Sequence, residues 1–182
     1  MRTQTLERLR VPITESDHIQ GAVGANSILL EYGDYECPAC GEAHHLVKAI
    51  LESVGDRVCF TYRHFPLTNV HPHAQSAAEA AEAAHAQGAF WEMHDRLFEN
   101  QEALEYGDLT DYAEDLGLDS SRLINEVLDG VYAGRVQKDL TSGVRSGVDG
   151  TPTFFINGVR YDGPSDLNSI VAALAYAGKW WP

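Results

Sequence analysis

The sequence predicts an α/β fold with a helical insertion in its middle, and three observations indicate it. An apolar run at residues 27–33 is followed by a helical pattern and a second strand pattern at 57–65. Residues 66–148 carry one helical pattern after another, and strand patterns return only at 151–163, before a last helix. A strand–helix–strand unit forms a parallel pair with a right-handed crossover. The expected order is therefore β, α, β, helical block, β, β, α.

The first strand–helix–strand unit is marked by a change of hydrophobic period. Residues 27–33, SILLEYG, have the apolar character of a buried strand with one acid inside it. A helical face follows, made of Ala43, Leu46, Val47, Ile50, Leu51 and Val54. We expect Gly55 to end that helix as its cap. Residues 57–65, RVCFTYRHF, are β-branched and aromatic, which is typical of a strand.

The segment before this unit and the segment after it have different characters. Residues 1–26 are polar and contain glycine, so we expect an irregular, loosely attached lead-in. In the helical block, the Ala/Glu-rich stretch HAQSAAEAAEAAHAQG favours a helix that ends at Gly88. Later apolar stripes are predicted to be core, one of them capped by Asp119 or Ser120. The last two stripes contain Leu123, Ile124, Val127 and Leu128, then Val136, Leu140 and Val144.

The C-terminal part predicts a hairpin followed by a helix. Asn157-Gly158 between two strand patterns is the strongest short-range hairpin signal. The last helix has Pro164 near its first turn and Gly178 after it. We therefore divide the chain into the lead-in at 1–26, an α/β domain made of 27–65 and 149–182, and the helical insertion at 66–148.

Composition limits the kinds of partner. The chain has 182 residues and a net charge of −14, which argues against binding to nucleic acid or to anionic membranes. No stretch approaches the 18 or so consecutive apolar residues of a membrane span. The opening MRTQTLERLRVPITESD has no apolar core of the signal-peptide type. We therefore expect a cytoplasmic protein without a nucleic-acid or membrane partner.

The stretch CPAC carries the strongest chemical signal. Cys37 and Cys40 stand where the first strand ends and the helix begins, with Pro38 suited to the first helical turn. Cys37 then faces unpaired N–H groups, and cysteines in such positions have pKa values of roughly 3.5–7.5. Cys40 lies one turn deeper, near enough to close a disulfide. One thiol attacks and the other resolves, so the pair predicts a redox centre that needs no cofactor.

A zinc site is the alternative interpretation. Cys37, Cys40, Cys59 and His64 have a spacing that resembles a zinc ribbon. However, Cys59 is near the start of its strand, which places it roughly 16 Å from the strand end beside the helix. Cys59 is more consistent with a small buried hydrophobic residue. For the histidines at positions 44, 45, 71 and 73 we expect surface locations.

These features together resemble a known family. CPAC opening a helix, a helical insertion and GTPTFFING are similar to the DsbA-like branch of the thioredoxin superfamily, from about Ser27 to Gly178. The stretch from EYGDYECPACGEAHH to FWEMHDRLFEN looks like soluble bacterial DsbA-type proteins, and related domains occur fused to sodium/proton antiporters. The resemblance implies a thioredoxin fold and a protein disulfide oxidoreductase.

The resemblance also implies roles for individual residues. Cys37 would be the nucleophile and Cys40 the resolving thiol. Pro152 would be a cis-proline facing the pair, with Thr151 before it. Glu31, an acid inside an apolar strand, matches the buried acid that assists proton movement at the second cysteine, and burial raises a carboxyl pKa. The competing acids, Asp34 and Glu36, are expected to be exposed.

The expected function is disulfide exchange with protein substrates through a mixed disulfide, with an unknown redox partner. The substrate segment would lie extended beside Thr151 and Pro152. Two alternatives stay open: a glutathione-dependent kappa-class-like transferase or isomerase, and a redox-sensing module without turnover. The Pro-Ala dipeptide has no histidine, which predicts a less stabilised thiolate and a lower potential.

Overall fold

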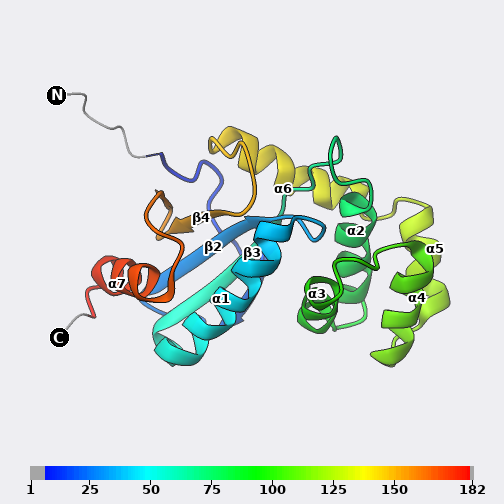
Figure 1. The fold of residues 1–182 in the computed structure, drawn as a ribbon, viewed down its shortest axis with the longest axis horizontal. Coiled ribbons are helices and arrows are strands. Elements are labelled where there is room, and N and C mark those ends of the chain that lie inside the picture. The colour runs from blue at the N-terminus through cyan, green and yellow to red at the C-terminus, as the bar shows by residue number, and fades with distance from the viewer. Residues whose placement is uncertain (1–6, 181–182) are drawn as a thin grey trace.

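A computed structural model describes residues 7–180 and shows a five-stranded mixed sheet flanked by helices (Figure 1). The strands are β1 (His18–Gly21), β2 (Ser27–Gly33), β3 (Val58–His64), β4 (Thr153–Ile156) and β5 (Val159–Tyr161), in the order β1-β3-β2-β4-β5. β2 and β3 are parallel, whereas the other neighbours are antiparallel. The predicted α/β fold is confirmed.

The helices fall into two groups. α1 (Pro38–Val54), the 3₁₀ turn η1 (Gly55–Arg57) and α7 (Leu167–Gly178) belong to the sheet domain. α2 (Ala74–His85), α3 (Phe90–Glu99), α4 (Tyr106–Asp115), α5 (Ser120–Leu128) and α6 (Ala133–Arg145) lie between β3 and β4 in the chain, and all but α6 stand to one side in Figure 1. They form the predicted insertion, whose boundaries at 66 and 148 stay a prediction. None of the helices within residues 7–180 is long and apolar enough to cross a bilayer.

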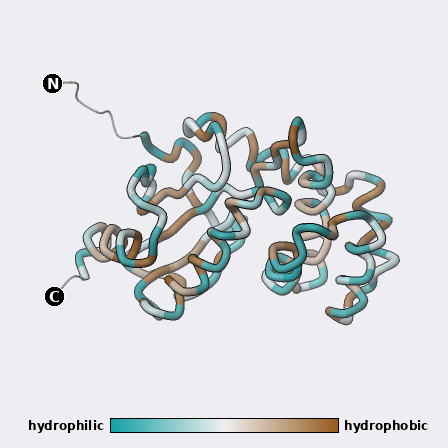
Figure 2. The backbone as a smooth tube through the Cα atoms, viewed as in Figure 1, coloured by the Kyte–Doolittle hydropathy of each residue, from teal (hydrophilic) through white to brown (hydrophobic). Residues whose placement is uncertain are grey.

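Alternation along β2 places hydrophobic residues on both faces of the sheet. Leu29 belongs to the main core, which includes Ile50 of α1 and Leu174 of α7. Leu30 and Tyr32 belong to a second cluster, to which α6 contributes Leu140. Because side chains in a strand alternate with period two, Glu31 lies on the same face as Leu29, toward α1. Figure 2 shows the hydrophobic residues that run along the central strands.

The predicted loose lead-in is wrong over its second half. His18–Gly21 forms β1, which pairs antiparallel with β3 through His18↔Tyr62 and Gly21↔Cys59. Further upstream, Leu9 N–H donates to Gly158 O at 2.9 Å beside β5. The sequence HIQG is too short and too polar to show a strand pattern. It forms a strand because it pairs with the otherwise free edge of β3. The first six residues of the lead-in are outside the described part of the chain.

Most of the local signals are confirmed, and some core assignments are wrong. Gly55 caps α1 with φ 56°, and Asp119 caps α5 by accepting from Arg122 N–H. Asn157 and Gly158 both have positive φ in the hairpin turn. By contrast, Leu128 and Val144 are 58% and 62% exposed, because each lies at the margin of its helical stripe.

The start and end of α7 also differ from the prediction. Pro164 precedes the helix, and Asp166 caps it by accepting from Ser169 N–H. Gly178 is the last helical residue, and Lys179 is the cap in a left-handed conformation.

A buried polar cluster fixes the insertion to the sheet. Glu82 of α2 accepts at Oε1 from His18 Nε2 of β1 at 2.8 Å and from His64 Nε2 of β3 at 2.9 Å. Arg135 of α6 lies 3.7 Å from the same oxygen. Because Glu82 and both histidines are buried, their polar atoms depend on one another for partners. The cluster therefore sets how the insertion stands beside the cysteine helix.

Candidate active site

The cysteine pair lies at the N-terminus of α1, as predicted. Cys37 is the N-cap residue and Pro38 occupies the first turn. The backbone N–H groups of Cys40 and Gly41 donate to Cys37 O at 3.0 and 3.2 Å. Cys37 is 7% exposed, whereas Cys40 is fully buried. Only the first thiol can therefore meet a macromolecular substrate directly.

The two thiols have opposite electrostatic environments. A hydrogen bond from the Cys40 thiol, helped by the N–H groups of Cys40 and Ala39, lowers the pKa of Cys37 to about 5 against the effect of burial. Burial and the same hydrogen bond raise the pKa of Cys40 well above its ordinary value. The Cys37 thiolate is therefore stabilised without a histidine in the dipeptide, and the lower potential expected from Pro-Ala stays a prediction.

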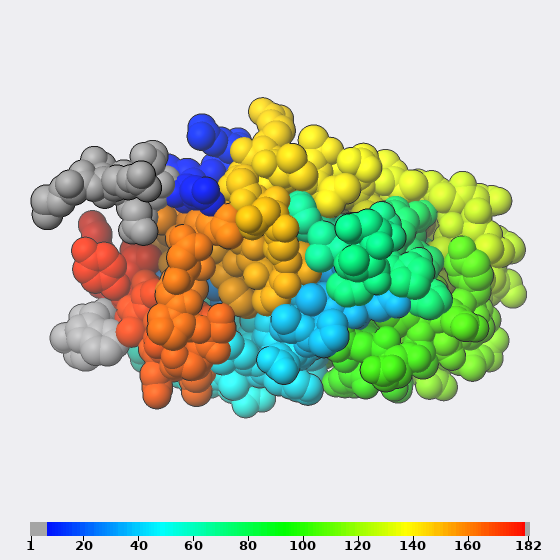
Figure 3. Space-filling view, turned by 45° about the horizontal axis from the view of Figure 1, so that its top comes forward, coloured from blue at the N-terminus to red at the C-terminus, as the bar shows by residue number. Residues whose placement is uncertain are grey.

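The loop before β4 brings Thr151 and Pro152 to the cysteine pair. The Thr151–Pro152 peptide bond is cis, and Cys37 Sγ lies 3.5 Å from Thr151 O. In the space-filling view the first turns of α1, in cyan, lie near the orange segment that carries β4 (Figure 3). The two positions are 114 residues apart in the chain. The structure thus brings Cys40, Thr151 and Pro152 to the thiol of Cys37, and their catalytic roles stay predictions.

Glu31 lies on β2 beneath the pair and is 2% exposed. Its Oε1 has no hydrogen-bond partner among the described residues. Burial, followed by the charge of Cys37, raises the pKa of Glu31 to about 8, and Glu31 in turn contributes to the raised pKa of Cys40. The carboxyl group can therefore take or release a proton near neutral pH. Its role in catalysis stays a prediction.

Asp34 and Glu36 are not the exposed acids that the sequence suggested. Asp34 is buried and accepts from Glu36 N–H, Leu67 N–H and His71 Nδ1, each at 2.8 Å. Glu36 accepts from His73 N–H at 2.7 Å. The surface expectation for His71 and His73 is therefore incomplete, since both hold the loop that precedes Cys37. The HPH sequence, which follows soon after the end of a predicted strand, is the local pattern that could have indicated these contacts.

Sequence reasoning also missed Gln101 and Gly41. Gln101 Nε2 donates to Tyr35 O and to Cys37 O, both at 2.8 Å. A Cβ at Gly41 would collide with the Gln101 side chain, so glycine leaves the space that this amide needs. No local pattern could reveal a contact that joins positions more than 60 residues apart.

The residues of the zinc alternative are not brought together. Cys59 pairs with Ile28 near the start of β2, whereas His64 pairs with Gly33 at its end. Within residues 7–180, the side-chain groups with metal-binding spacing contain no cysteine; they are His18, His64 and Glu82, and His44, His94 and Asp95.

His44 is buried and stacks on Phe98 with 5.1 Å between ring centroids, so its predicted surface location is wrong.

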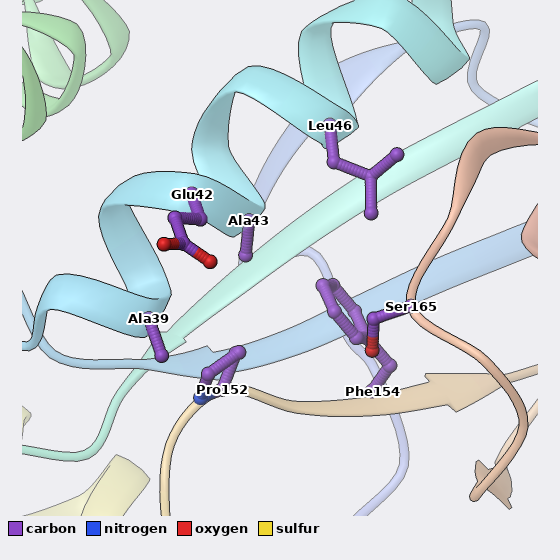
Figure 4. A pocket seen from close by; sticks show the side chains of 7 residues that line it. All are labelled: Ala39, Glu42, Ala43, Leu46, Pro152, Phe154 and Ser165. Atoms are coloured by element: carbon purple, nitrogen blue, oxygen red, sulfur yellow. The ribbon is translucent and has the colours of Figure 1, made fainter.

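A groove of about 410 Å³ adjoins Pro152 and the cysteine turn. Figure 4 shows its two walls, one from α1 and the other from β4 and the loop that carries Ser165. Its lining residues are Ala39, Glu42, Ala43, Leu46, Pro152, Phe154 and Ser165. A chain bound beside Pro152 would therefore place side chains in this groove.

Comparisons with known proteins agree with this arrangement. A sequence model of the family described as Thioredoxin matches residues 13–175. The chain is 46% identical over 170 residues to Na(+)/H(+) antiporter NhaA 3 of Salinispora tropica, covering 93% of this chain and 26% of that protein. It is 41% identical over 160 residues to NhaA of Herminiimonas arsenicoxydans, covering 88% and 25%. The chain thus spans about a quarter of the length of these relatives.

Solved structures share the fold at low identity. BdbD from Bacillus subtilis has a TM-score of 0.82 and 22% identity, covering 90% of this chain and 93% of that one. Wolbachia pipientis α-DsbA1 has a TM-score of 0.77 and 19% identity, covering 94% and 96%. With the family match over residues 13–175, these likenesses establish that the chain belongs to the thioredoxin family and has the DsbA-like form of its fold.

Proposed function

We propose that this chain exchanges disulfides with protein substrates through Cys37 and Cys40. The single observation that carries the proposal is the asymmetry of the two thiols. Cys37 is partly accessible at a helix N-terminus with a pKa of about 5, whereas Cys40 is buried with a raised pKa. Such a division matches one attacking thiol and one resolving thiol.

In the reducing direction, the Cys37 thiolate attacks one sulfur of a substrate disulfide. A bond forms between Cys37 Sγ and that sulfur, and the other substrate sulfur leaves as a thiolate. Cys40 then gives up its proton and attacks Cys37 Sγ, which closes the Cys37–Cys40 disulfide and releases the second substrate thiolate. Glu31 is the proposed proton acceptor, because in the mixed disulfide Cys37 carries no charge and no longer raises the Glu31 pKa, so the ionised carboxylate is favoured at this step. The reverse sequence donates the disulfide to a substrate dithiol, and a dithiol or disulfide partner restores the starting state.

The low pKa of Cys37 favours the donating direction. A stabilised thiolate is a good leaving group, and stabilising the reduced state makes a disulfide more oxidising. We therefore expect the Cys37–Cys40 potential, measured against a glutathione series, to be higher than that of a pair whose attacking thiol has its ordinary pKa of 9.0.

Covalent trapping in cell extract tests the assignment of the two thiols. Cys40→Ser should accumulate adducts with proteins that dithiothreitol releases, because attack persists and resolution is lost. Cys37→Ser should accumulate few, because the buried Cys40 is a poor first nucleophile. Non-reducing electrophoresis separates these outcomes. Equal trapping by both variants would show that the nucleophile is assigned wrongly.

The antiporter relatives favour a second candidate, a regulatory module whose redox state controls partner binding. This function requires the disulfide but no turnover. An insulin-reduction assay with a recycling reductant separates the two functions. Sustained turnover supports the oxidoreductase, whereas a single turnover together with redox-dependent binding supports the module.

A further inference from the structure

We propose that Glu42 makes the groove beside Pro152 a subsite for a lysine or arginine side chain of the substrate. This inference rests on the proposed function and names the class of sequence on which it acts. It is carried by the composition of the groove, by the lack of a partner for Glu42 and by the position of the groove next to the reacting sulfur.

The groove combines an apolar floor with one carboxylate. Ala43, Leu46 and Phe154 supply the floor, whereas Glu42 is the one charged side chain among the lining residues. In Figure 4 the Glu42 carboxylate lies on the α1 wall, across the groove from Phe154 and Ser165. Lysine and arginine have the matching form, because their methylene stems cover apolar surface while the charged head reaches a polar partner.

Glu42 has no cation of its own within the described chain. The single lysine of α1, Lys48, pairs with Asp95 at 2.9 Å and with Glu99 at 3.3 Å, away from Glu42. Among residues 7–180, no ion pair or hydrogen bond is formed by the Glu42 side chain, and no basic residue lines the groove. A bound cation would therefore gain a carboxylate without displacing an existing partner.

The position of the subsite connects it to the exchange reaction. Ala39 and Pro152 line the groove, and each is a direct chain neighbour of a residue at the reaction centre. Ala39 precedes Cys40, and Pro152 follows Thr151, whose carbonyl oxygen lies 3.5 Å from Cys37 Sγ. A peptide whose cysteine meets Cys37 would thus place a nearby residue beside Glu42.

Paired peptides test the subsite directly. Each peptide has one cysteine thiol, and arginine is moved through the three positions on either side of it. A matched peptide has uncharged citrulline in place of arginine. The measurement is the rate at which the peptide thiolate opens the Cys37–Cys40 disulfide of the full chain. At the favoured position the arginine peptide should react about two- to fivefold faster, the range of an exposed ion pair.

Two charge-neutralising variants separate a local subsite from general attraction by the net charge of −14. Glu42→Gln should bring the arginine-to-citrulline ratio to about one. Glu52→Gln removes the same charge from an exposed position on the same helix, ten residues further along, and should keep the ratio. Raised salt should weaken the preference in the wild type.

Each outcome has a definite meaning. A ratio near one at every position in the wild type, or an equal loss in both variants, overturns the subsite but leaves disulfide exchange standing. If no peptide thiol opens the disulfide, the proposed function itself fails and the subsite fails with it. A positional preference that only Glu42→Gln removes establishes the subsite.

Discussion

Cys37 and Cys40 are three positions apart in the chain, yet their thiols differ in accessibility and pKa. The difference arises because Cys37 lies at the helix end, where N–H groups are free, while Cys40 lies under the first turn. The hydrogen bond between the two thiols is the largest factor that stabilises the Cys37 thiolate. Thiolate stability at Cys37 is therefore a property of the pair.

The pH dependence of alkylation measures this coupling. In the reduced Cys59→Ala protein, the rate of Cys37 alkylation by iodoacetamide should rise around pH 5 and be flat above about pH 7. In the matched variant that also carries Cys40→Ala, the rise should move upward by about one pH unit or more, because the main hydrogen bond is lost. A rise centred near pH 9 in the Cys59→Ala protein would contradict the stabilised thiolate.

Glu31 contributes a loss of stability to the reduced protein as pH rises, and this opposes the gain from Cys37, whose pKa in the folded chain is about 5 instead of 9.0. The folded chain holds a proton on Glu31 up to about pH 8, whereas the unfolded chain releases it near 4.5. At Glu31 the unfolded state therefore binds fewer protons between these values, so this group's contribution to stability falls across the range. Glu31→Gln lacks this contribution and should gain stability relative to the wild type between pH 5 and pH 8, by on the order of a few kcal/mol.

Urea unfolding of the reduced proteins at pH 5 and pH 8 checks this prediction, with Glu52→Gln as the exposed control. An equal change of stability between pH 5 and pH 8 in wild type and Glu31→Gln would contradict it. A second measurement addresses the catalytic role. Glu31→Gln should slow release of the mixed disulfide more than its formation, as followed by stopped-flow fluorescence.

At the scale of elements, the turn between β2 and α1 is held by a residue of the insertion. Gln101, which follows α3, donates to two carbonyl groups of this turn. The contact fixes the start of the cysteine helix, and Gly41 provides the space for it. The insertion therefore contributes to the geometry of the site without supplying a catalytic group.

Gln101→Leu should destabilise the protein by roughly 1–3 kcal/mol, because Tyr35 O loses its side-chain donor and Cys37 O loses one of its three donors. It should also slow mixed-disulfide formation, since the position of Cys37 becomes less fixed. Denaturant unfolding and peptide kinetics measure the two effects. Gln137→Leu is the matched control, because within the described part of the chain the Gln137 side chain bonds only to exposed Thr141 of its own helix. Equal stability and equal rates of mixed-disulfide formation in the two variants would show that Gln101 does not hold the turn.

At the scale of the whole molecule, the Glu82 cluster joins β1, β3, α2 and α6. Burial opposes ionisation of Glu82, but hydrogen bonds from His18 and His64 hold its pKa below the ordinary value of 4.5. The ionised carboxylate thus stabilises the fold above pH 4.5, and this contribution is lost as pH falls below it.

Glu82→Gln should lower the free energy of unfolding at pH 7 by roughly 1–3 kcal/mol, because the buried His18 and His64 rings lose the ionised oxygen to which they bond. Because the variant lacks the carboxylate, its stability should depend less on pH below 4.5 than that of the wild type. Urea unfolding at pH 7 and pH 3.5 measures both effects, with Glu92→Gln on the exposed side of α3 as control. A loss no larger than that of the control would show that the cluster does not hold the insertion.

The sequence by itself determined the parts that depend on neighbours in the chain. The cysteine pair at a helix start, the Gly55 cap, the Asn157-Gly158 turn and the run of insertion helices all follow from short-range spacing. Such signals are reliable because backbone hydrogen bonds and helical faces join residues a few positions apart. The resemblance to the DsbA-like branch added the type of fold, which is confirmed, and roles for the paired thiols, which stay predictions.

Tertiary structure alone decided the rest. β1 exists because β3 has a free edge, Asp34 is buried because the loop after β3 closes over it, and Gln101 reaches the turn from the insertion. Glu42 lines a groove only because the fold places Pro152, from a distant part of the chain, beside α1. These contacts join residues tens of positions apart, and their partners are selected by packing and by the need to satisfy buried polar groups. Contacts selected in this way do not recur at a fixed spacing along the chain, so a local sequence pattern cannot reveal them.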